Sequence, residues 1–224
     1  MPVRKFSFTN GEFYHVYNRG VNRRKIFLNP SDYLKFIGTI NYYSYSDHKI
    51  RFSEYCSLSF ENQLDYFNRL NKKGISIVAF VQMPNHFHFL LKQLEDDYLM
   101  NFLRLIQNSY TRYFNLKHGR IGHLFQGHFK AVHVDRNEQL LHLSRYIHLN
   151  PATSNIVKTM DELEHYNWSS LPAYISSGSS KLNFITTEPI LEQFETSQDY
   201  GKFVEDQIGY QRELEYIKHL SLED

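Results

Sequence analysis

Apolar positions in this 224-residue chain follow two different periods, and each period predicts a different kind of element. Period-two alternation, or a short apolar run bounded by Gly, Pro or Asn, predicts strands over residues 12–17, 75–81, 86–91 and 124–134. Recurrence at three and four residues predicts helices over residues 29–45, 60–70, 97–117 and 135–151. Residues 47–58 fit neither pattern.

The strand expected over residues 86–91 carries two imidazoles on one face. Because side chains alternate along a strand, His86 and His88 point to one side while Phe87 and Phe89 enter the core on the other. Pro84 lacks a backbone donor and is expected in the turn, which puts both histidines at the start of this strand. The preceding run, 75–81, is apolar on both faces, as in a central strand.

Two interpretations of this histidine pair are open. Neutral imidazole is the commonest metal ligand, so a divalent cation is one natural partner for the two rings. The alternative is that the rings hydrogen-bond to neighbours or face water, which is the more frequent situation for an isolated His-x-His. The metal interpretation therefore needs support from elsewhere in the chain.

That support comes from the helix expected over residues 135–151. Asp135 or Asn137 can cap its start, and Pro151 is expected to end it. Tyr146 and Asn150 are four residues apart and therefore lie one turn above each other. If this helix packs beside the histidine strand, a phenol and an amide oxygen reach the two imidazoles together.

These motifs resemble those of a known family. His86-Phe87-His88 resembles the HUH motif, and Met-Pro-Asn-His-x-His followed by Arg-Tyr-Ile-x-Leu-Asn-Pro at 145–151 is similar to the single-tyrosine HUH transposases, most closely the REP-associated tyrosine transposases. The segments 109–115 and 122–130 also resemble that branch. The resemblance runs from about Phe13 to Ala152 and implies an α+β fold with a ferredoxin- or RRM-like antiparallel sheet and helices on one face.

The resemblance also implies a reaction, namely cleavage of single-stranded DNA through a covalent tyrosine link. Tyr146 is the expected nucleophile, and His86, His88 and Asn150 are the expected ligands of Mg²⁺ or Mn²⁺. Tyr110 and Tyr113 are rival nucleophiles on the helix 97–117. We rank them lower because they lie on or near its packing stripe.

The distribution of charge adds a binding surface to this picture. A net charge of +1 hides basic zones over residues 1–26 and 100–136 and an acidic region over 186–224, an asymmetry expected where one face meets phosphates. The expected partner is single-stranded DNA with a hairpin, such as a REP-like palindrome, bound by a monomer or a homodimer. The residues expected to contact DNA are Asn18, Arg19, Arg23, Arg24, Lys25, Arg112, Arg120, Gln126 and Lys130.

The chain is expected to comprise a transposase domain over residues 1–152, with an insertion at about 47–74, and a helical extension over 153–224 that packs on it. The role of this extension is not determined by the sequence. One cysteine, Cys56, excludes an internal disulfide and favours a reducing compartment. With no signal peptide and no long apolar run, a cytoplasmic protein without membrane contact is expected.

Two other functions remain as alternatives. A metal-dependent nuclease could use the same histidine pair to activate water, and a non-catalytic hairpin-binding protein could use an RRM-like sheet. Neither alternative explains the spacing of the tyrosine and the asparagine. The sequence alone does not determine which hairpin is recognised, or whether Tyr146 serves its own chain or that of a partner.

Overall fold

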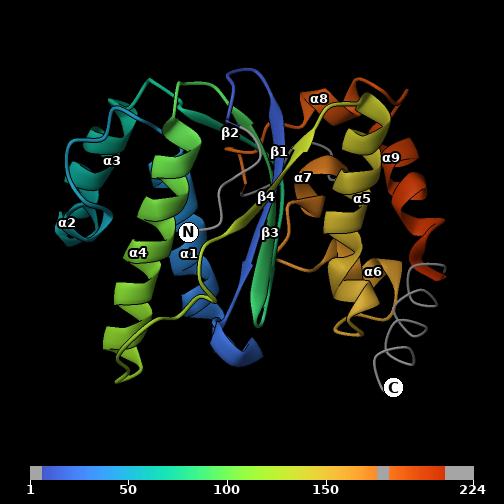
Figure 1. Ribbon diagram of the computed structural model, residues 1–224. Helices are drawn as coiled ribbons and strands as arrows, with labels where there is room; N and C mark the ends of the chain where they lie inside the picture. The colour runs from blue at the N-terminus through green and yellow to red at the C-terminus, as the bar shows by residue number, and fades with distance from the viewer. Residues whose placement is uncertain (1–6, 176–181, 210–224) are drawn as a thin grey trace.

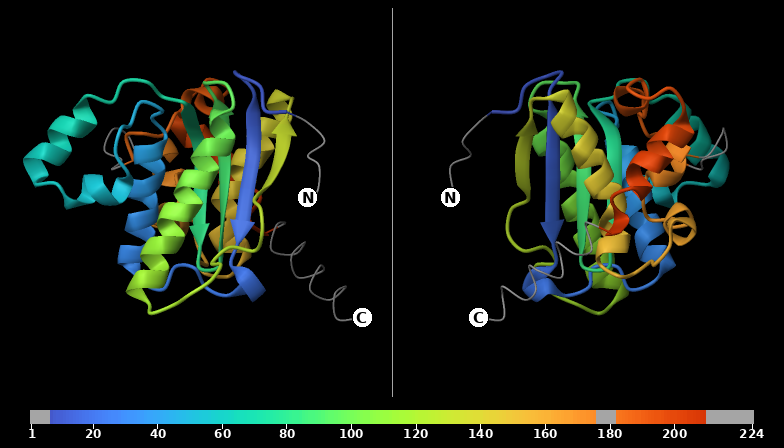
Figure 2. Two further views of the ribbon diagram at one scale, coloured as in Figure 1. Left: turned by 60° about the vertical axis from the view of Figure 1, so that its left-hand side comes forward. Right: turned by 90° about the vertical axis from the view of Figure 1, so that its right-hand side faces the viewer.

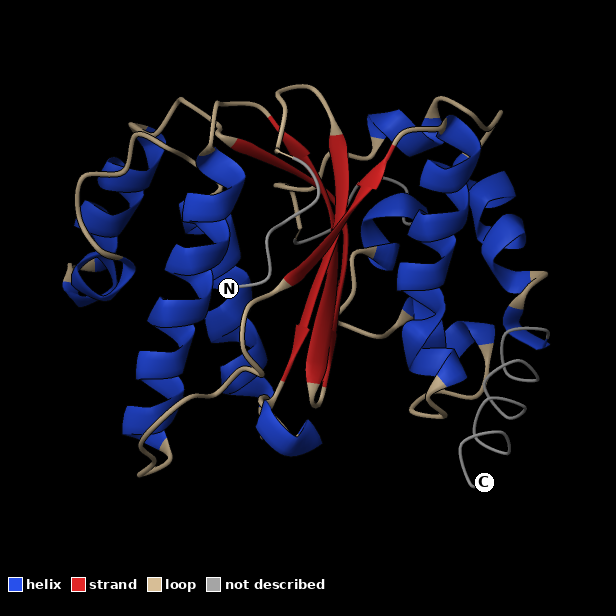
Figure 3. Cartoon of the chain, in the orientation of Figure 1, coloured by secondary structure: helices blue, strands red, loops and turns tan. Residues whose placement is uncertain are grey.

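The computed structural model describes residues 7–175 and 182–209. It has three layers, with a twisted sheet between two layers of helices (Figures 1 and 3). The strands are β1 (Phe13–Arg19), β2 (Ile75–Met83), β3 (His86–Gln93) and β4 (Lys130–Val134). The first half of the chain also contains a short 3-10 helix, η1 (Val21–Arg23), and the helices α1 (Pro30–Tyr43), α2 (Phe52–Ser57), α3 (Phe60–Asn68) and α4 (Tyr98–Lys117). The second half contains α5 (Asn137–Thr153), α6 (Met160–Glu164), α7 (Leu171–Ile175), α8 (Glu188–Leu191) and α9 (Ser197–Glu205).

The order of strands in the sheet is β2-β3-β1-β4, and every neighbouring pair is antiparallel. Two strand-helix-strand units interleave, one running through α1 and the other through α4, which is the ferredoxin-like arrangement. The predicted α+β class with an antiparallel sheet is therefore confirmed. β2 lies at the edge of the sheet and not at its centre, although all nine of its residues are buried. Bridges to Ser169 and Ile185 cover this edge.

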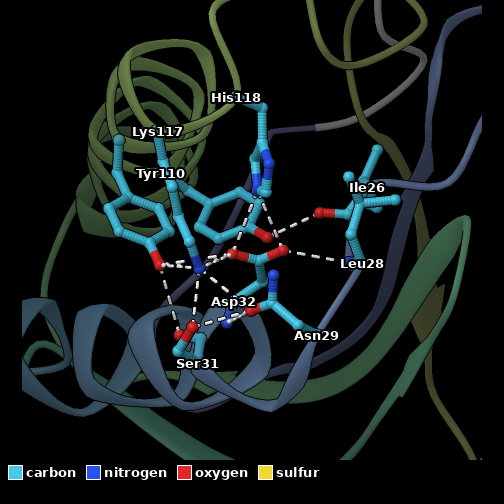
Figure 4. A network of polar contacts seen from close by, with 9 residues as sticks. Ile26, Leu28, Asn29, Ser31, Asp32, Tyr110, Lys117 and His118 are labelled. Atoms are coloured by element: carbon cyan, nitrogen blue, oxygen red, sulfur yellow. Dashed lines mark hydrogen bonds and ion pairs between the residues drawn. The ribbon is translucent and has the colours of Figure 1, made fainter.

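The first face of the sheet packs against α1 and α4. Its core is rich in aromatic side chains, among them Phe87 and Phe89 of β3, which contact Phe36 of α1. The two helices are also tied together by the fully buried carboxylate of Asp32, which accepts hydrogen bonds from Lys117 and from the backbone of Leu28 (Figure 4). The helices α2 and α3 project outward beyond α1 (Figure 2).

The second face of the sheet is covered by α5 and the helices that follow it (Figure 1). The expected helices on one face are α1 and α4. For the whole chain the expectation is corrected, because α5 and the later helices cover the other face. The physical reason is that β2 is apolar and buried on both faces, so that a single layer of helices would leave half of its surface in water. The sequence carried this signal in the apolar run 75–81.

Three predicted boundaries also need correction. Pro151 lies inside α5, which continues to Thr153, because a proline in the last turn removes only one hydrogen bond of the helix. Neither Asp135 nor Asn137 caps α5, whose N-cap is Arg136 without a side-chain bond. The last strand, predicted from residue 124, begins at Lys130.

The C-terminal helices hold α5 on the sheet through buried polar groups. His148 of α5 is fully buried, with Nδ1 at 2.7 Å from the Tyr200 hydroxyl and Nε2 at 2.8 Å from Ser170 Oγ. Burial lowers the pKa of His148 to about 3. Arg145 lies with its guanidinium 4.0 Å from the centre of the Phe203 ring of α9. The helices that follow residue 152 therefore fix the position of α5.

The division into residues 1–152 and 153–224 stays a prediction. Residues 176–181 and 210–224 of the predicted extension lie outside the described residues. Within the described part of the chain, none of the helices is both long and apolar enough to cross a bilayer.

We expect Tyr200→Phe to lower the free energy of unfolding by about 1 to 3 kcal/mol, the usual effect of leaving a buried polar atom without its partner. The substitution removes the hydroxyl that meets His148 Nδ1 and donates to Ser144 Oγ at 3.1 Å. Urea denaturation followed by circular dichroism measures the change. Tyr45→Phe, at a half-buried ring outside this network, is the control and should change stability by less than about 0.5 kcal/mol. Equal effects of the two substitutions would contradict this role of Tyr200.

Candidate active site

His86 and His88 lie at the start of β3, on the face of the sheet that α5 covers. Their cross-strand partners on β2, Met83 and Val81, belong to the core beneath α5. Phe87 and Phe89 pack on the opposite face. The alternation predicted from the sequence is confirmed, and the two imidazole rings lie 5.1 Å apart with perpendicular planes, at 87°.

Each imidazole has a hydrogen-bond partner at Nδ1. His86 Nδ1 lies 2.7 Å from Asn85 Oδ1, and His88 Nδ1 lies 2.9 Å from His15 Nε2 of β1. Because an amide oxygen only accepts, a neutral His86 that donates to Asn85 carries its proton on Nδ1 and has its lone pair on Nε2. The nitrogens left to bind a ligand are therefore the Nε2 atoms of the two rings.

Burial keeps these imidazoles neutral at physiological pH. It lowers the pKa of His88 well below the ordinary value, and the neighbouring rings of His86 and His15 lower it further. Burial also lowers the pKa of His86, although a hydrogen bond with Asn150 acts in the opposite direction. The pKa of His15 falls to about 4 for the same reason. A neutral imidazole keeps a lone pair, which is the form that binds a metal ion.

Tyr146 reaches this site from α5. Its ring centre lies 5.6 Å from that of His88, nearly perpendicular to it at 89°, and 6.2 Å from that of His15. Asn150 is 5% exposed and lies one turn further along α5, with Nδ2 donating to the backbone oxygen of Tyr146 at 2.9 Å. Because Nδ2 makes this bond, the amide oxygen of Asn150 is the atom that interacts with His86. The four side chains predicted as a catalytic group thus lie together within one chain.

A cavity of about 570 Å³ opens beside the histidine pair. Its wall includes both imidazoles and five of the residues predicted to contact DNA, which are Asn18, Arg19, Arg23, Gln126 and Lys130. Asn18 is itself buried and donates to Gln107 Oε1 at 2.7 Å, so only part of its side chain is available to a ligand. The cationic side chains of Arg19, Arg23 and Lys130 make the cavity basic.

Two glycines bring residue 126 to this cavity although it is far from β1 in the sequence. Gly20 bridges Phe125, and a Cβ at residue 20 would lie 2.2 Å from the backbone oxygen of Arg24, so no larger residue fits there. Gly127 has a φ of 62°, in the left-handed region that favours glycine. Gln126 then accepts a hydrogen bond from Arg19 Nε.

The structure does not bring the other predicted basic residues to this cavity. Arg24 and Lys25 are exposed in the loop after η1. Arg112 lines a different cavity of about 470 Å³ on the outer side of α4. Arg120 lies beyond the end of α4, with its guanidinium 5.6 Å from the ring of Phe114. Their contact with DNA stays a prediction.

The rival tyrosines lie on the other face of the sheet. Tyr110 is fully buried and donates its hydroxyl proton to the backbone oxygen of Ile26. Tyr113 donates to Asp32 Oδ1 at 3.2 Å, within the network that ties α1 to α4. Neither phenol is near the histidine pair, because α4 packs opposite α5.

The prediction missed three residues that border the site, which are His15, Tyr17 and Asn85. The alternation of Phe13, His15 and Tyr17 on β1 was visible in the sequence. It could not show that this face joins the histidine face, because that depends on the pairing of Tyr17 with His88 across β1 and β3.

The donor set fits a divalent metal ion. Two imidazole Nε2 atoms and one carboxamide oxygen are available, and their side chains are buried or half-buried. Over residues 7–175 and 182–209, no group of three or more His, Cys, Asp or Glu side chains is arranged as a metal site. A third ligand from this chain would therefore be the carboxamide of Asn150.

Two comparisons with known proteins give a match for this chain. Residues 60–150 match the family model described as "Transposase IS200 like", a segment that contains the histidine pair, Tyr146 and Asn150. Comparison with the curated proteins gives no significant match.

Among solved structures, the chain is similar to a REP-associated tyrosine transposase bound to a REP hairpin. The TM-score is 0.55 at 18% sequence identity, and the match covers 83% of this chain and 92% of the other. Residues 60–150 of this chain thus match the model of the IS200-like transposases, and the chain shares its fold with a REP-associated tyrosine transposase.

Proposed function

We propose that this chain cleaves and rejoins single-stranded DNA at a hairpin-flanked site, with Tyr146 as the nucleophile. The observation that supports this most strongly is the position of the Tyr146 ring, 5.6 Å from that of His88 in the same chain, with Asn150 one turn away. A phenol beside neutral imidazoles, on the same helix as an amide side chain one turn away, suits phosphoryl transfer to tyrosine.

The proposed reaction exchanges one phosphodiester bond for another. The phenolic oxygen of Tyr146 attacks the scissile phosphorus, the bond from phosphorus to the 3′ oxygen breaks, and that oxygen gains a proton as the phenol loses one. The products are a 5′-phosphotyrosine and a free 3′-hydroxyl. Because a phenol, with an ordinary pKa of about 10, leaves more readily than an alkoxide, an incoming 3′-hydroxyl can reverse the step and join two strands.

A divalent ion, Mg²⁺ or Mn²⁺, would be held by His86 Nε2, His88 Nε2 and Asn150 Oδ1. When bound, it supplies Lewis acidity at the scissile phosphate. The chain itself orients these three ligands, because Asn85 and His15 occupy the other ring nitrogens and the Asn150 amide is bonded back to α5.

DNA would enter through the basic cavity beside the histidine pair. Arg19, Arg23 and Lys130 line it, and exposed cations of this kind neutralise phosphates. The solved relative is bound to a REP hairpin, which supports hairpin DNA as the partner of this chain.

Covalent trapping tests this proposal. Single-stranded hairpins with flanking single strands, labelled at either the 5′ or the 3′ end, are incubated with the protein in Mn²⁺ or in EDTA and resolved on a denaturing gel. We expect a protein–DNA adduct that carries the 3′ label, because the phosphate stays with the strand on its 3′ side. The adduct should form in Mn²⁺ and disappear in EDTA.

The alternatives give different products in the same assay. Free 5′-phosphate ends without any adduct would replace the transposase proposal with a nuclease that activates water. Hairpin binding without cleavage, in a protein that takes up no Mn²⁺, would replace it with a binding module.

A further inference from the structure

His15 of β1 lies at the centre of the candidate site, although neither the family motif nor the DNA cavity includes it. Its neighbour on the same face of β1, Tyr17, pairs with His88 across the two strands. This register places His15 diagonally opposite His88, with Nε2 at 2.9 Å from His88 Nδ1. The two rings are nearly parallel, at 17°.

This hydrogen bond determines which nitrogen of His88 carries a lone pair. A neutral imidazole has one N–H and one lone pair, so the ring that donates at this contact keeps its lone pair at the opposite nitrogen. If His88 donates from Nδ1, its Nε2 can bind a ligand. If His15 donates instead, His88 holds its proton on Nε2 and cannot coordinate an ion there.

Asn85 provides the same control at the first imidazole. Its Oδ1 lies 2.7 Å from His86 Nδ1 and can only accept, so a neutral His86 that donates there keeps its lone pair at Nε2. A site that uses both histidines through the same atom requires His15 to be the acceptor for His88. Partners of this kind set the tautomer and orientation of metal-bound imidazoles in other proteins.

We infer that His15 is a positioning residue that accepts a hydrogen bond from His88 Nδ1 and thereby presents His88 Nε2 to a divalent ion. This inference rests on the metal site of the proposed function. His15 acts through His88 and contacts neither DNA nor the ion.

Two substitutions separate this role from simple packing. His15→Phe keeps an aromatic ring beside Tyr17, whose ring centre is 5.1 Å from that of His15, but it has no acceptor. His15→Gln loses the ring but places an amide oxygen at similar reach. If packing alone matters, the His15→Phe variant should bind Mn²⁺ more tightly than the His15→Gln variant. If the acceptor matters, the Gln variant should bind Mn²⁺ more tightly.

Calorimetric titration with Mn²⁺ in the absence of DNA gives the first readout. We expect His15→Phe to weaken Mn²⁺ binding by about 10- to 100-fold, the usual effect of losing an outer-shell partner, and His15→Gln to restore most of the affinity. Wild-type affinity in the Phe variant would overturn the inference, and so would a Gln variant as weak as the Phe variant.

The tautomer of His88 in the metal-free wild-type protein gives a second readout that needs no variant. Long-range ¹H–¹⁵N correlation spectra should show the His88 proton on Nδ1 and that of His15 also on Nδ1. A wild-type His88 that carries its proton on Nε2 would overturn the inference. This measurement remains decisive if the wild-type protein binds no Mn²⁺, a result that would count against the metal in the proposed function.

Discussion

Tyr146→Phe should abolish the covalent protein–DNA adduct on a cleavable single-stranded hairpin, with a loss of more than about a thousandfold in adduct formation. The substitution removes only the attacking oxygen. The Phe ring can keep its perpendicular contact with His88, 5.6 Å away, and α5 stays in place through His148 and Arg145. Denaturing gels of Mn²⁺ reactions measure the adduct, and a gel-shift assay with the same hairpin should show binding within about threefold of wild type.

Tyr113→Phe is the matched control for this experiment. Its phenol lies on the opposite face of the sheet, where it donates to Asp32, so its loss should leave the adduct intact. An adduct that persists in Tyr146→Phe and maps by mass spectrometry to Tyr110 or Tyr113 would refute the assignment of Tyr146.

Mixing two inactive variants, Tyr146→Phe and His86→Ala, should not restore adduct formation. In one chain, the Tyr146 ring already lies against His88, and α5 is held on its own sheet by buried contacts. His148 bonds to Ser170 and Tyr200 of the same chain, and breaking such contacts to swap α5 with a partner would expose polar groups that are now buried. Each site in the mixture would therefore lack either its phenol or a metal ligand.

Protein tags of different size make the outcome of the mixing experiment clear. In a dimer that exchanges α5, a site with the histidines of the Tyr146→Phe chain would receive the phenol of the His86→Ala chain. An adduct on the His86→Ala chain in the mixture, absent when either variant is alone, would show that Tyr146 serves a partner. Co-expression of the two chains excludes slow exchange as the cause of a negative result.

The local chemistry of the site could be predicted from the sequence because it depends on short spacings. The period of a strand places His86 and His88 on one face, and the period of a helix places Tyr146 and Asn150 one turn apart. Both periods are properties of the backbone and need no knowledge of the rest of the fold. The same reasoning located most of the strands and helices, with errors of a few residues at their ends.

Contacts between distant segments could not be predicted in this way. His15 and His88 are 73 positions apart, and they meet because β1 pairs with β3 in one particular register. His148 and Arg145 flank the candidate nucleophile, yet each has a partner on α9, more than 50 positions away. Sequence spacing gives no information on such pairs.

The sequence by itself determined which side chains share a face of one strand or one turn of one helix, because backbone geometry fixes that over a few residues. Only the tertiary structure decided that α5 covers the histidine face, that helices lie on both sides of the sheet, and that His15 and Asn85 hold the two imidazoles. The physical reason is that these arrangements depend on burying both apolar faces of β2 and on the pairing of β1 with β3, which are properties of the folded chain as a whole.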